Sequence, residues 1–125
     1  MASGVSPTQR TLKELRRMGR VVDMAERFNV YAGPHGVRQD LFGFIDIVAL
    51  EPGRIIGVQS TGQDFAGHRR KMLGPRRAMV RAWLESYGHV ELWGWRKLAE
   101  KRGSKRMVWR PRVEVITLET LEASP

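Results

Sequence analysis

The sequence predicts an α/β fold in which helices flank a mixed β-sheet, and three observations indicate it. Residues 44–50 and 54–61 are two apolar segments of strand length. Between them, Pro52 presets φ at the second turn position, and Gly53 supplies the positive φ that a type II turn needs next. On both sides of this pair, helical and strand patterns follow one another along the chain, as expected of an α/β domain.

The first helix is expected directly after a loose tail over residues 1–5. Ser6 suits the N-cap, Pro7 suits the first helical position, and Gln9 completes a capping box. The helix should stop at Gly19, because glycine readily adopts the left-handed conformation that follows a helix end.

The later elements complete the order α, β, β, β, α, β, with one more strand at the end. Asp64 is expected to cap the helix after the second central strand. Residues 98–106 are expected to form a mobile basic loop. The apolar face of the helix over 76–87 comprises Met79, Val80, Trp83 and Leu84. The other expected elements are a strand over residues 21–31, a loop over 32–36, a helix over 65–73, a strand over 89–97, and a last strand and tail over 107–121.

Composition limits the class of protein. The 125 residues suit one domain, and the absence of cysteine excludes disulfides, thiolate zinc sites and a cysteine nucleophile. A cytoplasmic location is expected, since the lack of cysteine is compatible with a reducing compartment. No apolar run approaches the roughly 18 residues of a membrane span, so we expect no membrane partner. The formal net charge of +9 predicts a polyanionic partner, most often nucleic acid.

A carboxylate, Asp46, interrupts the first apolar segment. A buried carboxylate is costly unless it is paired or binds a metal, so its presence needs an explanation. Because side chains alternate along a strand, Gln59 and Thr61 leave the second segment on one face. If Asp46 shares that face, three polar groups meet at one point of the core. A structural aspartate that accepts a bond from a backbone amide is the simpler alternative.

These residues resemble the PD-(D/E)XK nuclease superfamily, which includes Holliday-junction resolvases and many restriction enzymes. Asp46 matches the aspartate of its signature, and Gln59-Ser60-Thr61 stands where Glu-x-Lys is expected. The run Asp-Leu-Phe-Gly-Phe-x-Asp over residues 40–46, followed by Val-Gln-x-Thr over 58–61, also resembles small phage and bacterial proteins with this degenerate motif. The resemblance covers roughly residues 8–97, and the order of helices and strands expected there is that of the nuclease core.

The resemblance implies an endonuclease that acts on duplex or branched DNA with Mg²⁺ or Mn²⁺. It also implies a homodimer in a bacterial or phage-infected host cell. Asp46 and Gln59 would be metal ligands, but glutamine brings no charge and threonine cannot replace a lysine. The missing carboxylate could come from Glu14, Glu26 or Asp40, with Glu26 alternatively pairing with a nearby arginine. The missing cation could come from the following helix, where Lys71 is the preferred substitute. The candidate catalytic residues are therefore Asp46, Gln59, Thr61 and Lys71, and the candidate metal ligands are Asp46, Gln59 and Glu26.

Basic residues cluster after this site and supply the expected contacts to phosphates, which bind without reading sequence. Trp93 and Trp95 share one face of their strand and belong either to the core or to a surface that stacks on bases. The candidate nucleic-acid-binding residues are Arg38, Arg69, Arg70, Arg76, Arg77, Arg96 and Lys97.

Three functions remain open on the sequence alone. The first is a metal-dependent nuclease that uses Asp46. The second is a nucleic-acid-binding module on the same fold, without catalysis, whose binding needs neither metal nor Asp46. The third is an assembly protein without nucleic acid, for which the charge of +9 would be incidental.

Overall fold

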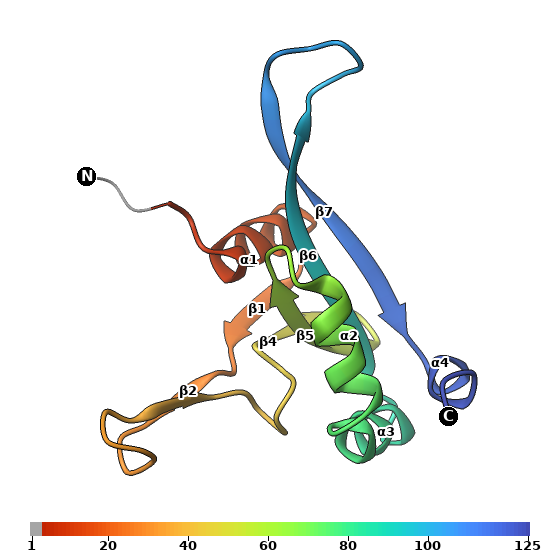
Figure 1. Cartoon of the computed structure of the whole chain (residues 1–125). Coiled ribbons are helices and arrows are strands. Elements are labelled where there is room, and N and C mark those ends of the chain that lie inside the picture. The colour runs from red at the N-terminus through yellow and green to blue at the C-terminus, as the bar shows by residue number, and fades with distance from the viewer. Residues whose placement is uncertain (1–3) are drawn as a thin grey trace.

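The computed structural model describes residues 4–125, so part of the tail expected over residues 1–5 lies outside the described residues. A five-stranded sheet forms the centre, and helices cover both of its faces (Figure 1). The helices are α1 (Pro7–Arg17), α2 (Phe65–Leu73), α3 (Arg77–Glu85) and α4 (Leu118–Glu122). The strands are β1 (Val21–Met24), β2 (Arg27–Asn29), β3 (Val37–Gln39), β4 (Ile47–Glu51), β5 (Arg54–Thr61), β6 (His89–Ala99) and β7 (Met107–Ile116).

The sheet has the order β1-β4-β5-β6-β7 and is mixed, as the sequence predicted. Strands β5 and β6 run parallel, with Gln59 opposite Leu92, and the other neighbouring strands run antiparallel. A parallel pair needs a crossover connection, which α2 and α3 provide.

The single strand predicted over residues 21–31 is wrong, because the chain leaves the main sheet after Met24. The backbone N–H groups of Ala25 and Glu26 donate to the carbonyl oxygen of Asp46, at 2.8 and 3.3 Å. These bonds take the place of a further ladder to β4. The chain then returns as β2, which pairs only with β3 in a separate two-stranded sheet.

The strand predicted over residues 44–50 begins later, at Ile47. Residues 41–45 form a tight turn instead, in which Gly43 has φ 77° and the N–H of residue 41 donates to the carbonyl of residue 45 at 2.9 Å. This turn places Asp46 at the start of β4 rather than in its middle. A side chain at a strand entrance can face other loops, which a mid-strand position would not allow.

Local signals at the helix ends and the central turn are confirmed. Ser6 and Gln9 form the reciprocal capping box at α1. Asp64 accepts a hydrogen bond from the N–H of Gly67 at the start of α2, and Gly53 has φ 78°. Within residues 4–125, no helix has both the length and the apolar character needed to cross a membrane.

Helix α4 was not predicted, because the segment was read as the tail of the last strand. Its capping box joins Thr117 and Thr120, whose side chains each bond the backbone N–H of the other. The Thr-x-x-Thr spacing was the available signal.

Met79 also differs from prediction, since it is 48% exposed while Val80 is buried on the same helix. Side chains one position apart on a helix point in different directions.

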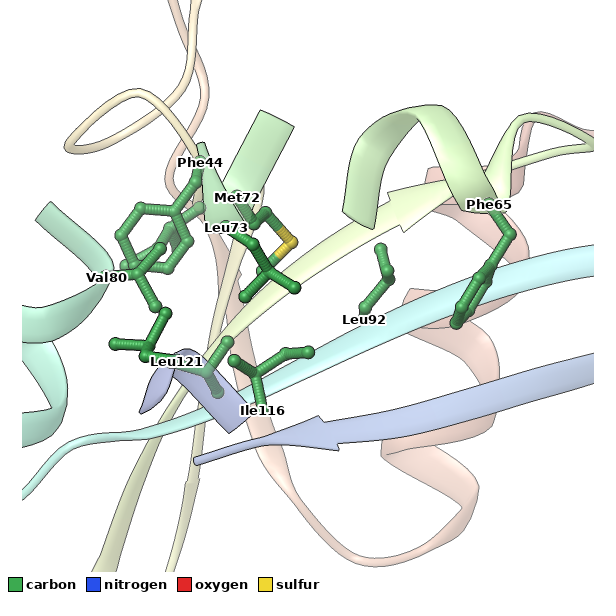
Figure 2. Close-up of a cluster of buried hydrophobic side chains, with 10 residues drawn as sticks. Phe44, Phe65, Met72, Leu73, Val80, Leu92, Ile116 and Leu121 are labelled. Carbon is green, nitrogen blue, oxygen red and sulfur yellow. The ribbon is translucent and has the colours of Figure 1, made fainter. Parts of the chain in front are cut away.

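Two apolar layers lie on opposite faces of the sheet. Under α2 and α3, one buried cluster joins these helices to β6, β7 and α4 (Figure 2). On the other face, Leu15 of α1 packs with Trp93 and Trp95. Their exposed fractions of 3% and 7% decide between the two sequence readings: both tryptophans are core residues. The indole N–H of Trp95 donates to Thr11 Oγ1 at 2.9 Å, which ties α1 to the sheet.

Two hairpins extend beyond the central sheet (Figure 1). The hairpin of β2 and β3 lies beside the entrance to β4. The second hairpin is formed by β6 and β7, whose pairing continues to Ala99 opposite Met107. The predicted loop over 98–106 is therefore shorter than expected, since its first two residues belong to β6.

Candidate functional site

Asp46 is the buried carboxylate around which the candidate site is built. Its own N–H donates to the carbonyl of Val58 at 2.8 Å, which continues the ladder between β4 and β5. Its Oδ2 accepts hydrogen bonds from Gln59 Nε2 and the Ser60 N–H, each at 2.8 Å, and from Ser60 Oγ at 3.3 Å. The structure thus brings Asp46 and Gln59 into direct contact.

Two more carboxylates join Asp46. Glu26 lies between β1 and β2, and Asp40 follows β3. One carboxylate oxygen from each of the three residues lies within 4.8 Å of the others. We call Glu26, Asp40 and Asp46 the acidic cluster. It depends on the two departures from prediction described above, because the break after β1 and the turn before β4 bring these loops together.

The surroundings of Asp46 disfavour its ionised form. Burial, together with the neighbouring Asp40 carboxylate, raises the pKa of Asp46 from its ordinary 3.8 to about 7. The hydrogen bonds from the Ser60 N–H and from Gln59 act in the opposite direction but do not offset the rise. Within residues 4–125, the groups that donate to Asp46 are all neutral.

Gln59 faces the acidic cluster with its amide nitrogen. Nε2 donates to Asp46 at 2.8 Å and makes a longer contact of 3.5 Å to Asp40 Oδ2. In this conformation the amide nitrogen of Gln59 lies between the two carboxylates. Thr61 is buried at the end of β5, opposite Gly94. Within residues 4–125, its side chain makes no hydrogen bond to the acidic cluster.

A cleft of about 410 Å³ opens beside Asp40, and positively charged side chains surround it. We call this the basic cleft. Lys71 reaches it from α2, Arg76 from the α2–α3 connection, and Arg27 and Arg38 from the β2–β3 hairpin. Its lining residues are Arg27, Val37, Arg38, Gln39, Asp40, Gly43, Lys71 and Arg76. A phosphate that entered the basic cleft would meet cations on several sides.

Three of the predicted phosphate contacts have partners within the protein. Arg38 donates to Glu26 at 3.1 Å, which confirms the alternative prediction that Glu26 pairs with a nearby arginine. Arg69 pairs with Glu114 at 2.9 Å and ties α2 to β7. Arg77 donates to the carbonyls of Leu73, Leu121 and Ser124, and so fastens α4 to α3. The guanidinium of Arg77 therefore contacts the chain's own C-terminal segment.

The remaining predicted residues lie elsewhere. Arg70 is exposed on α2. Arg96 and Lys97 line a different cleft at the end of the sheet, with Phe65 and Arg112. Glu14 pairs with Arg17 on α1, which covers the other face of the sheet, so it is separated from the acidic cluster.

Sequence reasoning missed Arg27 and Arg112 as members of the two clefts. Arg27 was predicted to lie within a continuous strand, and that prediction did not indicate that Arg27 and Lys71 line the same cleft. Arg112 follows Pro111 in the last strand, and a proline within a strand is typical of a sheet edge. That was the available signal that a cation there would face solvent.

Comparison with known proteins supplies no relative from which a function could be transferred. The chain matches no protein-family model, no curated protein and no solved structure. A mixed α/β sheet supports many unrelated activities, so the fold alone does not select one. The chemistry of the acidic cluster and the basic cleft is therefore what indicates a function.

Proposed function

We propose that the protein is a metal-dependent DNA phosphodiesterase of the endonuclease type, on a core like that of the PD-(D/E)XK nucleases. One observation carries the proposal: three carboxylates lie within 4.8 Å of one another, directly beside a cleft lined by Lys71 and three arginines. Phosphodiester hydrolysis requires this combination, because a phosphate must be bound by cations while a water is activated next to it.

The donor set of the acidic cluster fits Mg²⁺ or Mn²⁺. Both ions prefer hard oxygen ligands, and Glu26, Asp40 and Asp46 offer carboxylate oxygens at short mutual distances. Burial and the neighbouring Asp40 raise the pKa of Asp46, and a divalent ion at the acidic cluster would favour its ionised form. When bound, such an ion offsets charge on the phosphate and lowers the pKa of a bound water.

The chain's own residues have separate roles in this proposal. Lys71 would hold a phosphate oxygen, because its ammonium lines the same cleft as Asp40. Arg76 would bind the adjacent part of the backbone. Gln59 positions the acidic cluster, since its amide bridges Asp46 and Asp40. In this proposal, Asp40 or Glu26 takes the role of the glutamate in the nuclease signature. Lys71 takes the role of its lysine.

The order of elements also supports the nuclease-like core. Helix α1 precedes strands β1, β4 and β5, and the crossover helices lead to β6. A resolvase-type activity on branched DNA, and a homodimer that binds paired strands, belong to the same proposal. The basic cleft supports a nucleic-acid substrate by its charge and does not distinguish one DNA form from another.

Cleavage assays with a charge-neutral variant test the activity. Labelled single-stranded, duplex and four-way-junction DNA would be incubated with Mg²⁺ or Mn²⁺ and either wild type or Asp46→Asn. We expect metal-dependent cleavage by the wild type and a loss of about a thousandfold, or ~4 kcal/mol of barrier, in the variant. Asp23→Asn is the matched control, because Asp23 is exposed on β1 and should leave cleavage unchanged.

Metal binding provides a readout that does not depend on cleavage. Titration calorimetry with MnCl₂ should show one site in the wild type and in Asp23→Asn, and a much weaker one in Asp46→Asn. Lys71→Gln should keep the metal site but lose cleavage, because Lys71 acts on the phosphate. Equal Mn²⁺ affinity in wild type and Asp46→Asn would exclude the acidic cluster as the metal site.

A second function has one observation in its favour. Asp46 accepts three hydrogen bonds, one of them from the Ser60 backbone N–H, and this is also the pattern of a structural aspartate. A DNA-binding module without catalysis would bind DNA in EDTA, would not cleave it with either metal, and would keep its affinity in Asp46→Asn.

A further inference from the structure

Most of the net charge of the protein lies on one structural element. We call residues 96–112 the β6–β7 arm; it comprises the outer parts of the two strands and the loop that joins them. It contains eight lysine and arginine residues and one acidic residue, Glu100, so its net charge is +7 of the total +9. The positive residues are Arg96, Lys97, Lys101, Arg102, Lys105, Arg106, Arg110 and Arg112. The arm extends away from the rest of the fold (Figure 1).

The cations of the arm have almost no internal counter-charge. Within residues 4–125, the only ion pair on the arm joins Arg106 to Glu100, at 3.7 Å. Arg96 stands directly opposite Arg110 in the β6–β7 register, and like charges in that position destabilise a strand pair. A polyanion bound along the arm would remove this repulsion.

Positively charged side chains gather at the base of the arm. A cleft of about 270 Å³ lies there, lined by Arg96, Lys97 and Arg112 together with Phe65. The guanidinium of Arg112 lies over the Phe65 ring, 4.0 Å from its centre, which fixes the cation at the cleft wall. Gly94 makes this possible, because a Cβ there would lie 2.6 Å from the Phe65 ring.

We propose that the β6–β7 arm lies in the major groove of a DNA duplex and contacts the phosphates at the groove edges. A two-stranded β-ribbon has the width that the major groove of B-DNA admits. The major groove of A-form RNA is too deep and narrow for side chains to read, so the geometry favours DNA. Arg96, Arg110 and Arg112 would contact one strand of the duplex, and Lys101 and Arg102 at the tip would contact the other.

This inference deepens the proposed function by naming the form of the substrate and rests on it only for nucleic acid as the partner. The sheet face that carries Arg112 is the face that α2 covers, since Gly94 is opposite both Arg112 and Thr61. Gln59 lies on the same face, next to the acidic cluster. A duplex held by the arm would therefore be held on the side of the sheet where the proposed cleavage takes place.

The salt dependence of DNA binding tests the arm separately from catalysis. Fluorescence anisotropy with a 30-base-pair duplex in EDTA measures affinity with no metal, so failure of the nuclease proposal does not affect it. Each phosphate contact contributes about 0.9 to the slope of log K against log salt. We expect Arg96→Gln/Arg112→Gln to lower the slope by about 2. Lys13→Gln/Arg16→Gln, which removes the same charge from exposed positions on α1, should leave it unchanged.

A second variant protects the test against loss of fold. Lys101→Gln/Arg102→Gln changes only exposed loop side chains, and we expect the same fall in slope. Equal slopes for both arm variants and the α1 control would overturn the arm as the binding element.

The groove itself is tested by changing the nucleic acid. Wild type should bind duplex DNA at least about tenfold more tightly than duplex RNA or single-stranded DNA of equal length, since neither offers a wide major groove. Arg96→Gln/Arg112→Gln should lose that preference. Equal binding of duplex RNA, or tighter binding of single strands, would contradict placement in the major groove even if the arm binds phosphate.

Discussion

Two buried carboxylates of the same sheet, Glu91 on β6 and Asp46 at the start of β4, are balanced in opposite ways. Glu91 accepts two hydrogen bonds from the guanidinium of Arg20, at 2.8 and 3.2 Å, and one from the indole of Trp93 at 2.9 Å. Asp46 accepts only neutral donors and lies beside Asp40, another carboxylate. Both residues are 4% exposed, so burial does not distinguish them.

The difference separates a structural carboxylate from a candidate functional one. Arg20 also forms an ion pair with Glu51 at 3.1 Å. On the α1 side of the sheet, one guanidinium thus lies between two glutamates, and their charges are compensated within the protein. On the α2 side, the acidic cluster concentrates like charges and leaves the pKa of Asp46 raised. An arrangement that is internally incomplete is expected where a ligand supplies the missing charge.

The largest expected effect on stability is at Glu91. Glu91→Gln removes the charge that compensates Arg20 inside the protein, and breaking one partner of a buried ion pair typically costs about 3–5 kcal/mol. Urea unfolding measures the free energy of unfolding. Glu51→Gln is the control, because Glu51 is partly exposed and its replacement should lower the stability less. Mn²⁺ affinity of the folded fraction should not change. A loss below about 1 kcal/mol would mean that Arg20 does not depend on Glu91.

In contrast to Glu91→Gln, the variant Asp46→Asn should be more stable than wild type in metal-free buffer. Because the folded pKa of Asp46 is raised, the folded state binds its proton more tightly than the unfolded state does. Wild-type stability is therefore reduced as pH rises from about 4 to about 7 and stays reduced above that. The variant does not titrate, so its advantage should grow over the same range, toward a few kcal/mol at pH 8, since one pKa unit corresponds to about 1.4 kcal/mol.

Urea unfolding in EDTA at pH 4.5, 6 and 8 measures this advantage directly. Added Mn²⁺ should cancel it, because the ion stabilises only the wild type. Asp23→Asn, an exposed change of the same type, should show no trend with pH. An Asp46→Asn variant that is less stable than wild type at every pH would assign Asp46 a purely structural role.

The comparison also shows what the sequence could predict. Period-2 and helical patterns predicted the sheet, because burial of one face imposes them on each element separately. Asp46 was conspicuous for the same reason, as a charge within an apolar segment. Gln59 followed from alternation along β5, since its position relative to Asp46 depends only on the pairing of adjacent strands.

The composition of the acidic cluster required more than periodicity. Glu26 and Asp40 were among several carboxylates considered, and they join Asp46 because backbone bonds from residues 25 and 26 to the Asp46 carbonyl redirect the chain. Such bonds leave no trace in the pattern of apolar residues. The partner of Glu91 was missed for a similar reason, because Arg20 lies 71 residues away in the sequence and meets it only through the packing of α1.

The smallest expected effect is at Glu14, the other carboxylate considered as a substitute ligand. It pairs with Arg17 one turn along α1 at the protein surface, and such exposed pairs contribute little to stability. Glu14→Gln should therefore leave unfolding, Mn²⁺ affinity and DNA cleavage close to wild type, whereas Glu26→Gln should weaken Mn²⁺ binding. Calorimetry on the two variants side by side compares the same chemical change on the two faces of the sheet. Weaker Mn²⁺ binding in Glu14→Gln than in Glu26→Gln would place the metal on the α1 side and refute the acidic cluster as its site.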